Sequence, residues 1–467
     1  MSLRISAYLL DTQLVVLYAY VDMRNYQSWK DYQRQYKRKD FRKRFFEGLR
    51  KRLFKGSIWL FPVLLLTGIH YLKVGLSSDV CDGSPEIAGE LAVPAEGEGV
   101  AGLSVLMKKD LRELIDPESL CNSPESKIDI NYSGRSFIME TTIDSRLQSY
   151  MLKKIHGSQS PLIGFVAMDP ATGRILSMID SSKVKGAKDV CLSSQFPAAS
   201  IFKIVSAAAA IDRCNIFPDT KLTYNGRGHT LYKNQLTGRI NRHTNTISLE
   251  SSFAKSINPV FGKLGVFRLK KDLLEEYAIR FGFNQPINFE LPVQLSRLSV
   301  SDDSYHWAEI ACGFNRETLI SPLHGAMMAA AIVNGGKLVE PMIIECIIDD
   351  RKNPVYVGSA NIVRQVISPK TSQQMKELMA ATISRGTCRR TFSGHHRDKI
   401  LSKLFIGGKT GSINDKSNEL RYDWFVGFCG DKAGTRKLAL AVLVVHGKLI
   451  REKANQYARR AMRYYFG

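Results

Sequence analysis

The sequence lacks the cysteine patterns that mark a structural metal site. Its 467 residues include eight cysteines, but no two of them have CxxC spacing, and no cluster of cysteine and histidine has zinc-finger spacing. The sequence therefore argues against structural zinc, and it indicates neither another metal nor an organic cofactor. In an oxidising compartment Cys81 could bridge Cys121, or Cys191 could bridge Cys214. Ordinary buried thiols explain these residues equally well.

Acidic residues are scarce relative to basic ones. The chain has 44 Asp and Glu against 66 Lys and Arg, a formal net charge of +22. Residues 1–56 contribute +9 of this charge and the rest of the chain contributes +13. Such a charge suits nucleic acid, anionic lipid or an acidic polymer, and charge alone does not choose among them. With 44% hydrophobic residues, the composition is that of a globular protein of about two to three domains.

Charged side chains are absent from the apolar run Ser57–Leu72, SIWLFPVLLLTGIHYL. This run is shorter than the ~20 residues of a spanning helix, but Lys55 and Lys73 at its ends can extend it by snorkelling. A basic amphipathic stretch precedes it, which suits the cytoplasmic leaflet. By the positive-inside rule we expect a basic cytoplasmic segment over 1–56 and a single transmembrane helix over 57–75. Residues after about 75 would then lie outside the cytoplasm.

Two other interpretations of this run stay open. A cleaved signal peptide is disfavoured, because the basic region before the run exceeds fifty residues and no A-x-A site follows it. A buried core helix is kept open by Pro62 within the run. A second apolar stretch, Ile5–Val21, is interrupted by Asp11 and is left unassigned.

Residues 76–134 separate the apolar run from the rest of the chain. Their Gly, Pro, Ser and acidic side chains predict a linker or a small juxtamembrane module. Residues 97–102 match GxGxxG in form, but no apolar strand precedes them, so a dinucleotide site is not indicated. No internal repeat is evident along the chain.

From residue 135 to 467 the pattern becomes that of one large mixed domain. We expect strands near 137–142, 162–169 and 174–180, a helix from Ser145, a strand pair over 423–430 and 437–447, and a closing helix near 452–466. Helix-rich sequence fills the middle. Strands at both ends predict a sheet assembled from segments that are distant in sequence.

The strongest chemical motif is Ser200-Ile-Phe-Lys203, followed by the apolar run IVSAAAAI. A lysine three residues after a serine lies on the same helix face, within hydrogen-bond reach. A desolvated lysine can lose its proton and act as a base, and the helix N-terminus can stabilise an oxyanion. S-x-x-K often occurs by chance, but a lone lysine in a buried helix must be paired or functional.

Two further motifs follow in order along the chain: Ser256-Ile257-Asn258 and Lys409-Thr410-Gly411. Each is weak by itself. Ordered S-x-x-K, S-x-N and K-T-G together are typical of β-lactamases and penicillin-binding proteins.

From about residue 135 onward the chain resembles the penicillin-binding protein transpeptidase domain. The sequence around the motifs also resembles that of such domains, in the segments MDPATGRILSMID, ISPLHGAMMAAAIVNGG and DWFVGF. The resemblance implies a mixed α/β (α+β) fold, with a mainly antiparallel five-stranded sheet flanked by helices and a helical subdomain. Two departures are mild: Pro-Ala-Ala-Ser replaces the commoner Pro-Gly-Ser, and Ser412 stands where threonine is usual.

The resemblance also implies roles for the motif residues. Ser200 would attack the penultimate D-Ala carbonyl of a stem peptide and form an acyl-enzyme, and Lys203 would accept the serine proton. Ser256 would relay the proton toward the leaving amine, and Asn258 would hold the substrate amide.

The third motif would bind substrate. Its substrate-binding residues would be Lys409, Thr410, Gly411 and Ser412. Lys409 and Thr410 would bind the terminal carboxylate, and backbone N–H groups of Ser200 and Ser412 would form the oxyanion hole. The implied partners are peptidoglycan stem peptides, β-lactams as inhibitors, the inner membrane and a separate glycosyltransferase as a candidate. The implied function is cell-wall synthesis and cell shape.

Several alternatives compete with a peptidoglycan D,D-transpeptidase. A β-lactamase is disfavoured, because 409 − 258 = 151 residues separate the second and third motifs. A D,D-carboxypeptidase or endopeptidase shares the acylation step and differs only in the acceptor. A non-catalytic penicillin-binding sensor or scaffold is disfavoured by the three intact motifs. Nucleic-acid binding explains the basic N-terminus less well than an anchor does.

Overall fold

The computed structural model describes residues 106–132 and 134–467, which fall within one compact unit. The predicted cytoplasmic segment, the predicted transmembrane helix and most of the predicted linker therefore lie outside the described residues. Among the residues that are described, no helix is both long enough and apolar enough to cross a bilayer. Neither this finding nor the fold tests the predicted anchor.

A five-stranded antiparallel sheet forms the centre of the unit, with the strand order β13-β14-β15-β3-β4. Its strands are β3 (Leu162–Met168), β4 (Ile175–Ser182), β13 (Leu404–Asn414), β14 (Arg421–Asp431) and β15 (Lys437–His446). The pairing of β15 with β3 joins the two ends of the domain, so the predicted sheet from sequence-distant segments is confirmed. The predicted mixed fold, a mainly antiparallel five-stranded sheet flanked by helices, is confirmed as well, whereas the N-terminal transmembrane helix that was predicted with it stays a prediction.

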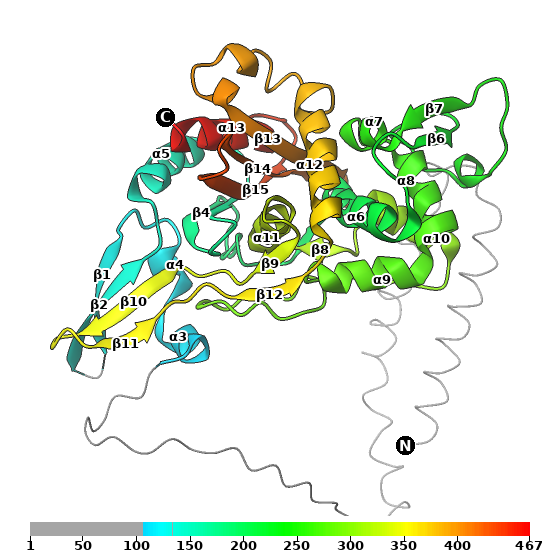
Figure 1. Ribbon diagram of the computed structural model, residues 1–467. Helices are drawn as coiled ribbons and strands as arrows, with labels where there is room; N and C mark the ends of the chain where they lie inside the picture. Colours follow the sequence, from blue (N-terminus) through cyan, green and yellow to red (C-terminus); the bar gives the residue numbers. More distant parts are fainter. Residues whose placement is uncertain (1–105, 133) are drawn as a thin grey trace, which may run out of the picture. The chain divides into compact units, whose positions relative to one another are not determined.

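Alternating apolar side chains give the sheet two buried faces. Odd residues of β15, such as Ala441 and Leu443, belong to one core, and even residues, such as Leu440 and Val442, belong to the other. Helix α11 (Pro322–Val333) covers the first face, and α5 (Ser145–His156) and α13 (Ala454–Tyr465) cover the second (Figure 1). The sheet is therefore the middle layer of a three-layer arrangement.

Serine followed by proline starts two of the long helices. Ser321 caps α11 by accepting from the backbone N–H of His324, and Ser368 caps α12 (Pro369–Ser384) by accepting from that of Thr371. Proline at the first helical position costs no hydrogen bond, because that N–H has no partner within the helix. All twelve residues of α11 are buried, so this helix is central to the core.

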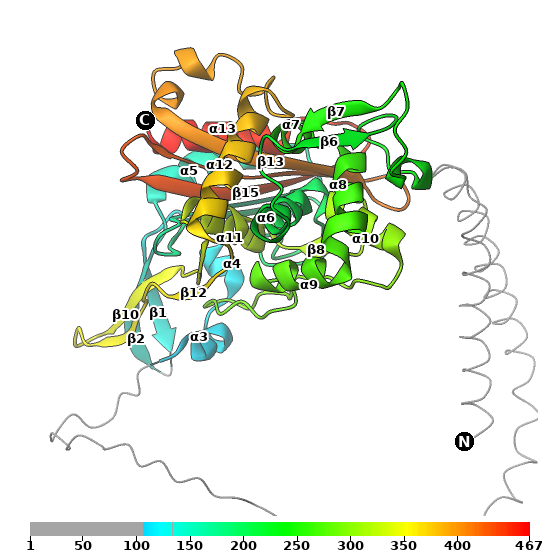
Figure 2. The same ribbon diagram turned by 45° about the vertical axis from the view of Figure 1, so that its right-hand side comes forward.

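A helical part lies beside the sheet (Figure 2). It contains the 3₁₀ turn η2 (Ala199–Phe202), α6 (Lys203–Cys214), η3 (Lys233–Leu236), α7 (Leu249–Ala254), α8 (Asn258–Leu264), the π-helical turn η4 (Gly265–Leu269), α9 (Lys270–Arg280) and α10 (Ser304–Cys312). Short strand pairs are β5 (Phe196–Pro197) with β8 (Leu319–Ile320), β6 (Lys221–Tyr224) with β7 (Asn245–Ser248), and β9 (Lys337–Val339) with β12 (Ile362–Gln365). Two 3₁₀ turns, η5 (His395–Arg397) and η6 (Leu401–Lys403), precede β13.

A second antiparallel sheet has the order β1-β2-β10-β11. Its strands are β1 (Lys127–Tyr132), β2 (Arg135–Thr141), β10 (Ile344–Asp349) and β11 (Pro354–Val357), and α3 (Lys108–Leu114) and α4 (Pro117–Leu120) precede them. Lys108 of α3 forms an ion pair with Glu340 at 3.1 Å. The folded unit therefore includes residues that the sequence analysis assigned to the 76–134 segment.

The described cysteines are all free thiols, so Cys191 and Cys214 do not form a bridge. Cys81 lies outside the described residues. Cys191 is fully buried, and its thiol donates to the carbonyl oxygen of Ile179 at 3.3 Å. This matches the interpretation of ordinary buried thiols.

Candidate active site

Ser200 lies in η2, a single 3₁₀ turn that leads directly into α6. Residues 204–211 of α6 are all buried, so the helix is held on every side. Trp424 of β14 is fully buried, and its indole N–H donates to the carbonyl oxygen of Pro197 at 2.9 Å. This bond fixes the strand that precedes the serine against the central sheet.

Lys203 has no exposed surface, and three oxygen atoms surround its amine. Its Nζ lies 2.8 Å from Ser200 Oγ, 2.8 Å from Asn258 Oδ1 and 2.5 Å from the backbone oxygen of Cys312. The last two can only accept hydrogen bonds. A neutral amine has two N–H groups for these acceptors and keeps its lone pair for the Ser200 hydroxyl proton.

Burial lowers the pKa of Lys203 from its ordinary value to about 8. The neutral form is therefore available near neutral pH. The Phe261 ring lies 5.6 Å from the amine and is part of the apolar wall that excludes water.

The second motif forms the turn between α7 and α8. Ser256 adopts a positive φ of 55°, a conformation that costs a non-glycine residue energy and is often found at functional sites. Its hydroxyl accepts a hydrogen bond from Lys409 Nζ at 3.0 Å. Asn258 begins α8 and lies against Lys203. The turn thus connects the two buried lysines.

The third motif lies on β13, the edge strand of the central sheet. Lys409 is fully buried and also donates to the carbonyl oxygen of Thr410 at 2.8 Å. Burial lowers the pKa of Lys409 well below its ordinary value, and the nearby positive charge of Lys203 lowers it further. An anionic group placed beside Lys409 would reverse this effect, which suits a carboxylate subsite.

Gly411 allows β13 to approach the nucleophile. A Cβ atom at this position would lie 3.2 Å from both the carbonyl oxygen of Ala198 and the amide nitrogen of Ile201. Ser412 is exposed, and its hydroxyl accepts from Arg421 Nε at 2.7 Å. The strand edge therefore runs directly beside the turn that carries Ser200.

The structure brings the three predicted motifs together. Ser200, Lys203 and Asn258 form one connected set, Lys409 and Ser256 form a second, and β13 places Thr410, Gly411 and Ser412 alongside them. The predicted catalytic role of each residue stays a prediction.

Sequence reasoning missed three residues that shape the site. Gly313 has a φ of 66°, and a Cβ there would lie 1.9 Å from the carbonyl oxygen of Ala199. Ala199 itself has a φ of 49°, a backbone conformation that glycine adopts more easily than alanine. The Thr387 hydroxyl lies 2.5 Å from that of Thr410. A glycine directly after Cys312, within ACGFN, was the available signal for the first of these.

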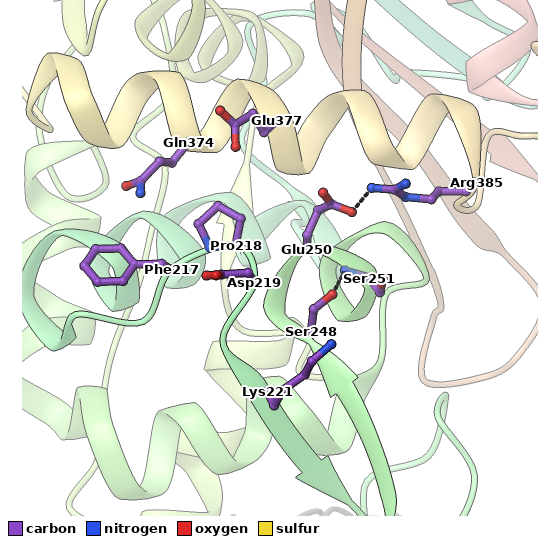
Figure 3. A pocket seen from close by; sticks show the side chains of 10 residues that line it. All are labelled: Phe217, Pro218, Asp219, Lys221, Ser248, Glu250, Ser251, Gln374, Glu377 and Arg385. Carbon is purple, nitrogen blue, oxygen red and sulfur yellow. Dashed lines mark hydrogen bonds and ion pairs between the residues drawn. The ribbon is translucent and has the colours of Figure 1, made fainter.

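A cavity of about 550 Å³ lies apart from the three motifs, between α7, the 217–221 loop and α12 (Figure 3). Ten residues line it, and none belongs to a predicted motif: Phe217, Pro218, Asp219, Lys221, Ser248, Glu250, Ser251, Gln374, Glu377 and Arg385. Glu250 and Arg385 point toward each other and form an ion pair. Because most of the Arg385 side chain is exposed, this pair contributes little stability.

Comparison with known proteins identifies the family. The family described as "Penicillin binding protein transpeptidase domain" matches residues 163–464. The chain belongs to this family. The predicted family and the predicted serine transpeptidase class are therefore confirmed.

Individual relatives are distant. The peptidoglycan D,D-transpeptidase PbpA of Mycolicibacterium smegmatis is 25% identical over 345 residues, which cover 66% of this chain and 67% of the relative. Stage V sporulation protein D of Bacillus subtilis is 26% identical over 294 residues, covering 59% of this chain and 44% of that protein.

Solved structures share the fold. The crystal structure of PBPA from Mycobacterium tuberculosis has a TM-score of 0.58 at 22% identity, covering 70% of this chain and 81% of that chain. An imipenem acyl-enzyme complex of penicillin-binding protein A from the same organism has a TM-score of 0.58 at 23% identity, covering 70% and 79%.

The pKa of Lys203 predicts how acylation depends on pH. With a pKa of about 8, the neutral fraction rises from about a tenth at pH 7 to about nine tenths at pH 9. We expect the rate of acylation by penicillin to rise about tenfold over this range, measured by stopped-flow or quenched-flow labelling. The Ser200→Ala variant serves as the blank for penicillin breakdown at each pH. A rate that is flat or falls across this range would contradict Lys203 as the base.

Gly313→Ala tests how the nucleophile is positioned. The added Cβ must displace Ala199, and a shift of about 1 Å at the nucleophile can reduce a rate about 100-fold. We expect penicillin acylation to slow by about that factor. Gly335→Ala is a matched control, because Gly335 has the same φ of 66° with nothing within 4 Å of its Cβ position. Equal acylation rates in the two variants would show that the contact does not position Ser200.

Proposed function

We propose that this protein is a peptidoglycan D,D-transpeptidase that cross-links stem peptides through an acyl-enzyme on Ser200. The observation that carries the proposal is the contact of the buried Lys203 amine with Ser200 Oγ, at 2.8 Å, with acceptor-only oxygens on its other sides. The relatives named D,D-transpeptidase and the β-lactam acyl-enzyme complexes of structural neighbours support it.

In the acylation step, Ser200 Oγ attacks the carbonyl carbon of the penultimate D-Ala while its proton passes to Lys203 Nζ. The developing oxyanion would be stabilised by the backbone N–H groups of Ser200 and Ser412, which lie on adjoining segments. Because the amine is dry and already held by Asn258 and Cys312, little reorganisation accompanies the transfer.

In the leaving-group step, the C–N bond to the terminal D-Ala breaks and its nitrogen takes a proton. Ser256 would relay this proton, and the hydrogen bond from Lys409 Nζ to its hydroxyl supports this role. Lys409 and Thr410 would bind the terminal carboxylate, which would be stabilised by the positive charge in this dry environment. An amine of a second stem peptide then attacks the ester, which restores Ser200 and completes the cross-link.

The proposed function also places the protein at the inner membrane. The apolar run Ser57–Leu72 would anchor the chain in the inner membrane, with its basic N-terminus in the cytoplasm and its transpeptidase domain in the periplasm. A glycosyltransferase on a separate chain would supply the glycan strands.

Labelling with a fluorescent penicillin tests the nucleophile. We expect a covalent band on a denaturing gel for the wild type and a loss of labelling of at least about 1,000-fold in Ser200→Ala. Ser393→Ala, a change at an exposed serine outside the motifs, should label like the wild type. Absence of labelling in a folded wild type would overturn the acyl-enzyme proposal.

The same protein, given a stem pentapeptide and a D-amino acid, tests the acceptor. Release of D-Ala with formation of the exchanged peptide supports a transpeptidase. Release of D-Ala with water as the sole acceptor would instead make the protein a D,D-carboxypeptidase.

Deletion of residues 1–75 tests the anchor. We expect the shortened chain to be recovered in the soluble fraction and to bind penicillin as the full chain does. The full chain should resist a high-salt wash and be released by detergent. If the shortened chain stays with membranes in high salt, the anchor assignment is wrong.

A further inference from the structure

The segment between α12 and β13 carries an unbalanced positive charge. Residues 385–403 contain six Lys or Arg and one acidic residue, 6 − 1 = +5. In Figure 1 the segment is the excursion drawn in orange above α12 and β13. Five of its cations, Arg389, Arg390, Arg397, Lys399 and Lys403, are exposed. None of these five side chains forms an ion pair or hydrogen bond within the described residues.

This excursion is folded onto the domain. Cys388, Phe392 and Leu401 are buried in the core beneath the central sheet, and the Phe392 ring stacks 6.3 Å from that of Phe425. Apolar residues thus point inward and cations point outward. The cations are presented from a fixed surface, which reduces the entropy lost when a partner binds.

The single acidic residue of the segment, Asp398, is bonded to groups of the folded domain. Asp398 accepts from the backbone N–H groups of Ile400 and Leu401 and from Arg463 Nε. These hydrogen bonds lower the pKa of Asp398 to about 2. Its charge therefore fixes the turn and does not neutralise the neighbouring cations.

The excursion begins at the active site. Thr387 contacts Thr410 of the third motif, and its backbone N–H donates to the carbonyl oxygen of Ala254, two residues before Ser256. A polymer bound along β13 would therefore continue over the cationic surface.

The two views of the domain agree that this surface lies at the end away from α3 and β11 (Figures 1 and 2). The described chain begins at α3, at that opposite end.

We propose that residues 385–403 form a docking surface for the carboxylate-bearing stem peptides of the polymer being cross-linked. This inference rests on the proposed function, in which each donor stem peptide ends in a carboxylate. Exposed cations contribute little as single ion pairs, but five of one sign beside the site raise the local concentration of an acidic polymer and steer it.

The test uses the full chain in detergent and purified peptidoglycan sacculi as the probe. The variant Arg389→Glu, Arg390→Glu, Lys399→Glu reverses three of the cations. We expect its binding to sacculi in 50 mM salt to weaken by about tenfold or more, with a shallower salt dependence than the wild type. Penicillin acylation should stay within about twofold, because a small β-lactam does not use the surface.

The matched control reverses three exposed lysines elsewhere, Lys109→Glu, Lys185→Glu, Lys337→Glu, with the same change of net charge. We expect the control to bind sacculi within about twofold of the wild type. Equal weakening in both variants would show a net-charge effect and overturn the docking surface. If the charge-reversed variant fails to fold, the variant Arg389→Gln, Arg390→Gln, Lys399→Gln replaces it. Its binding to sacculi should weaken by a smaller factor, because it removes the three charges without reversing them.

Two further probes separate the ligands. Sacculi whose carboxylates are converted to methylamides should lose most of the wild-type binding, and unchanged binding would overturn the inference. Vesicles of one part phosphatidylglycerol to three parts phosphatidylethanolamine should bind the wild type and the charge-reversed variant equally. If the reversal weakens vesicle binding and leaves sacculus binding intact, the surface binds lipid and the inference is wrong. Penicillin labelling that depends on Ser200 reports the proposed function separately in every case.

Discussion

The site depends on one contact, between the buried amine of Lys203 and the hydroxyl of Ser200. Removing a lysine amine from water penalises its charged form, and among the described residues no carboxylate contacts it to compensate. The nearest oxygens are a hydroxyl, an amide and a backbone carbonyl, which carry no formal charge. They hold the amine in place but add no negative charge that would stabilise its protonated form. The desolvation that costs folding free energy therefore also lowers the pKa of Lys203, as the proposed role of a base requires.

Most of the surrounding structure serves to keep that contact dry and rigid. The buried α6 carries the lysine, the C-terminal end of α10 supplies the Cys312 carbonyl, and α8 supplies Asn258. Lys409 sits in an equally buried position on β13, and its charge is unfavourable until an anion arrives. In the proposed mechanism, binding of the substrate carboxylate and readiness of the nucleophile are therefore coupled, because the two buried amines lie near one another.

Local sequence patterns predicted much of the fold, because the alternation and periodicity of apolar residues act within a few residues. The strands 162–169 and 437–447 and the helix from Ser145 are present. The relation of Ser200 to Lys203 was predictable because three residues along a helix place two side chains on one face.

Contacts between distant segments were not predictable from one sequence. The close approach of Gly313 to Ala199 joins residues more than a hundred positions apart, and nothing local distinguishes it from a glycine at a helix end. The Thr387 contact with Thr410 depends on how the 385–403 excursion folds back. The sequence analysis did not predict that α3 and β1 belong to the folded unit, and the reason is the same. β1 pairs with its neighbour β2, but the sheet that holds both also needs β10, which lies about 200 residues further along the chain.

The role of Lys203 as a base is tested by its own titration, followed by NMR in protein labelled at lysine Cε and assigned with Lys203→Arg. We expect a Cε resonance that titrates near pH 8, well below the pH at which exposed lysines titrate. A Lys203 resonance that stays in the charged form to above pH 10 would contradict this role, because the amine would then be no base at neutral pH.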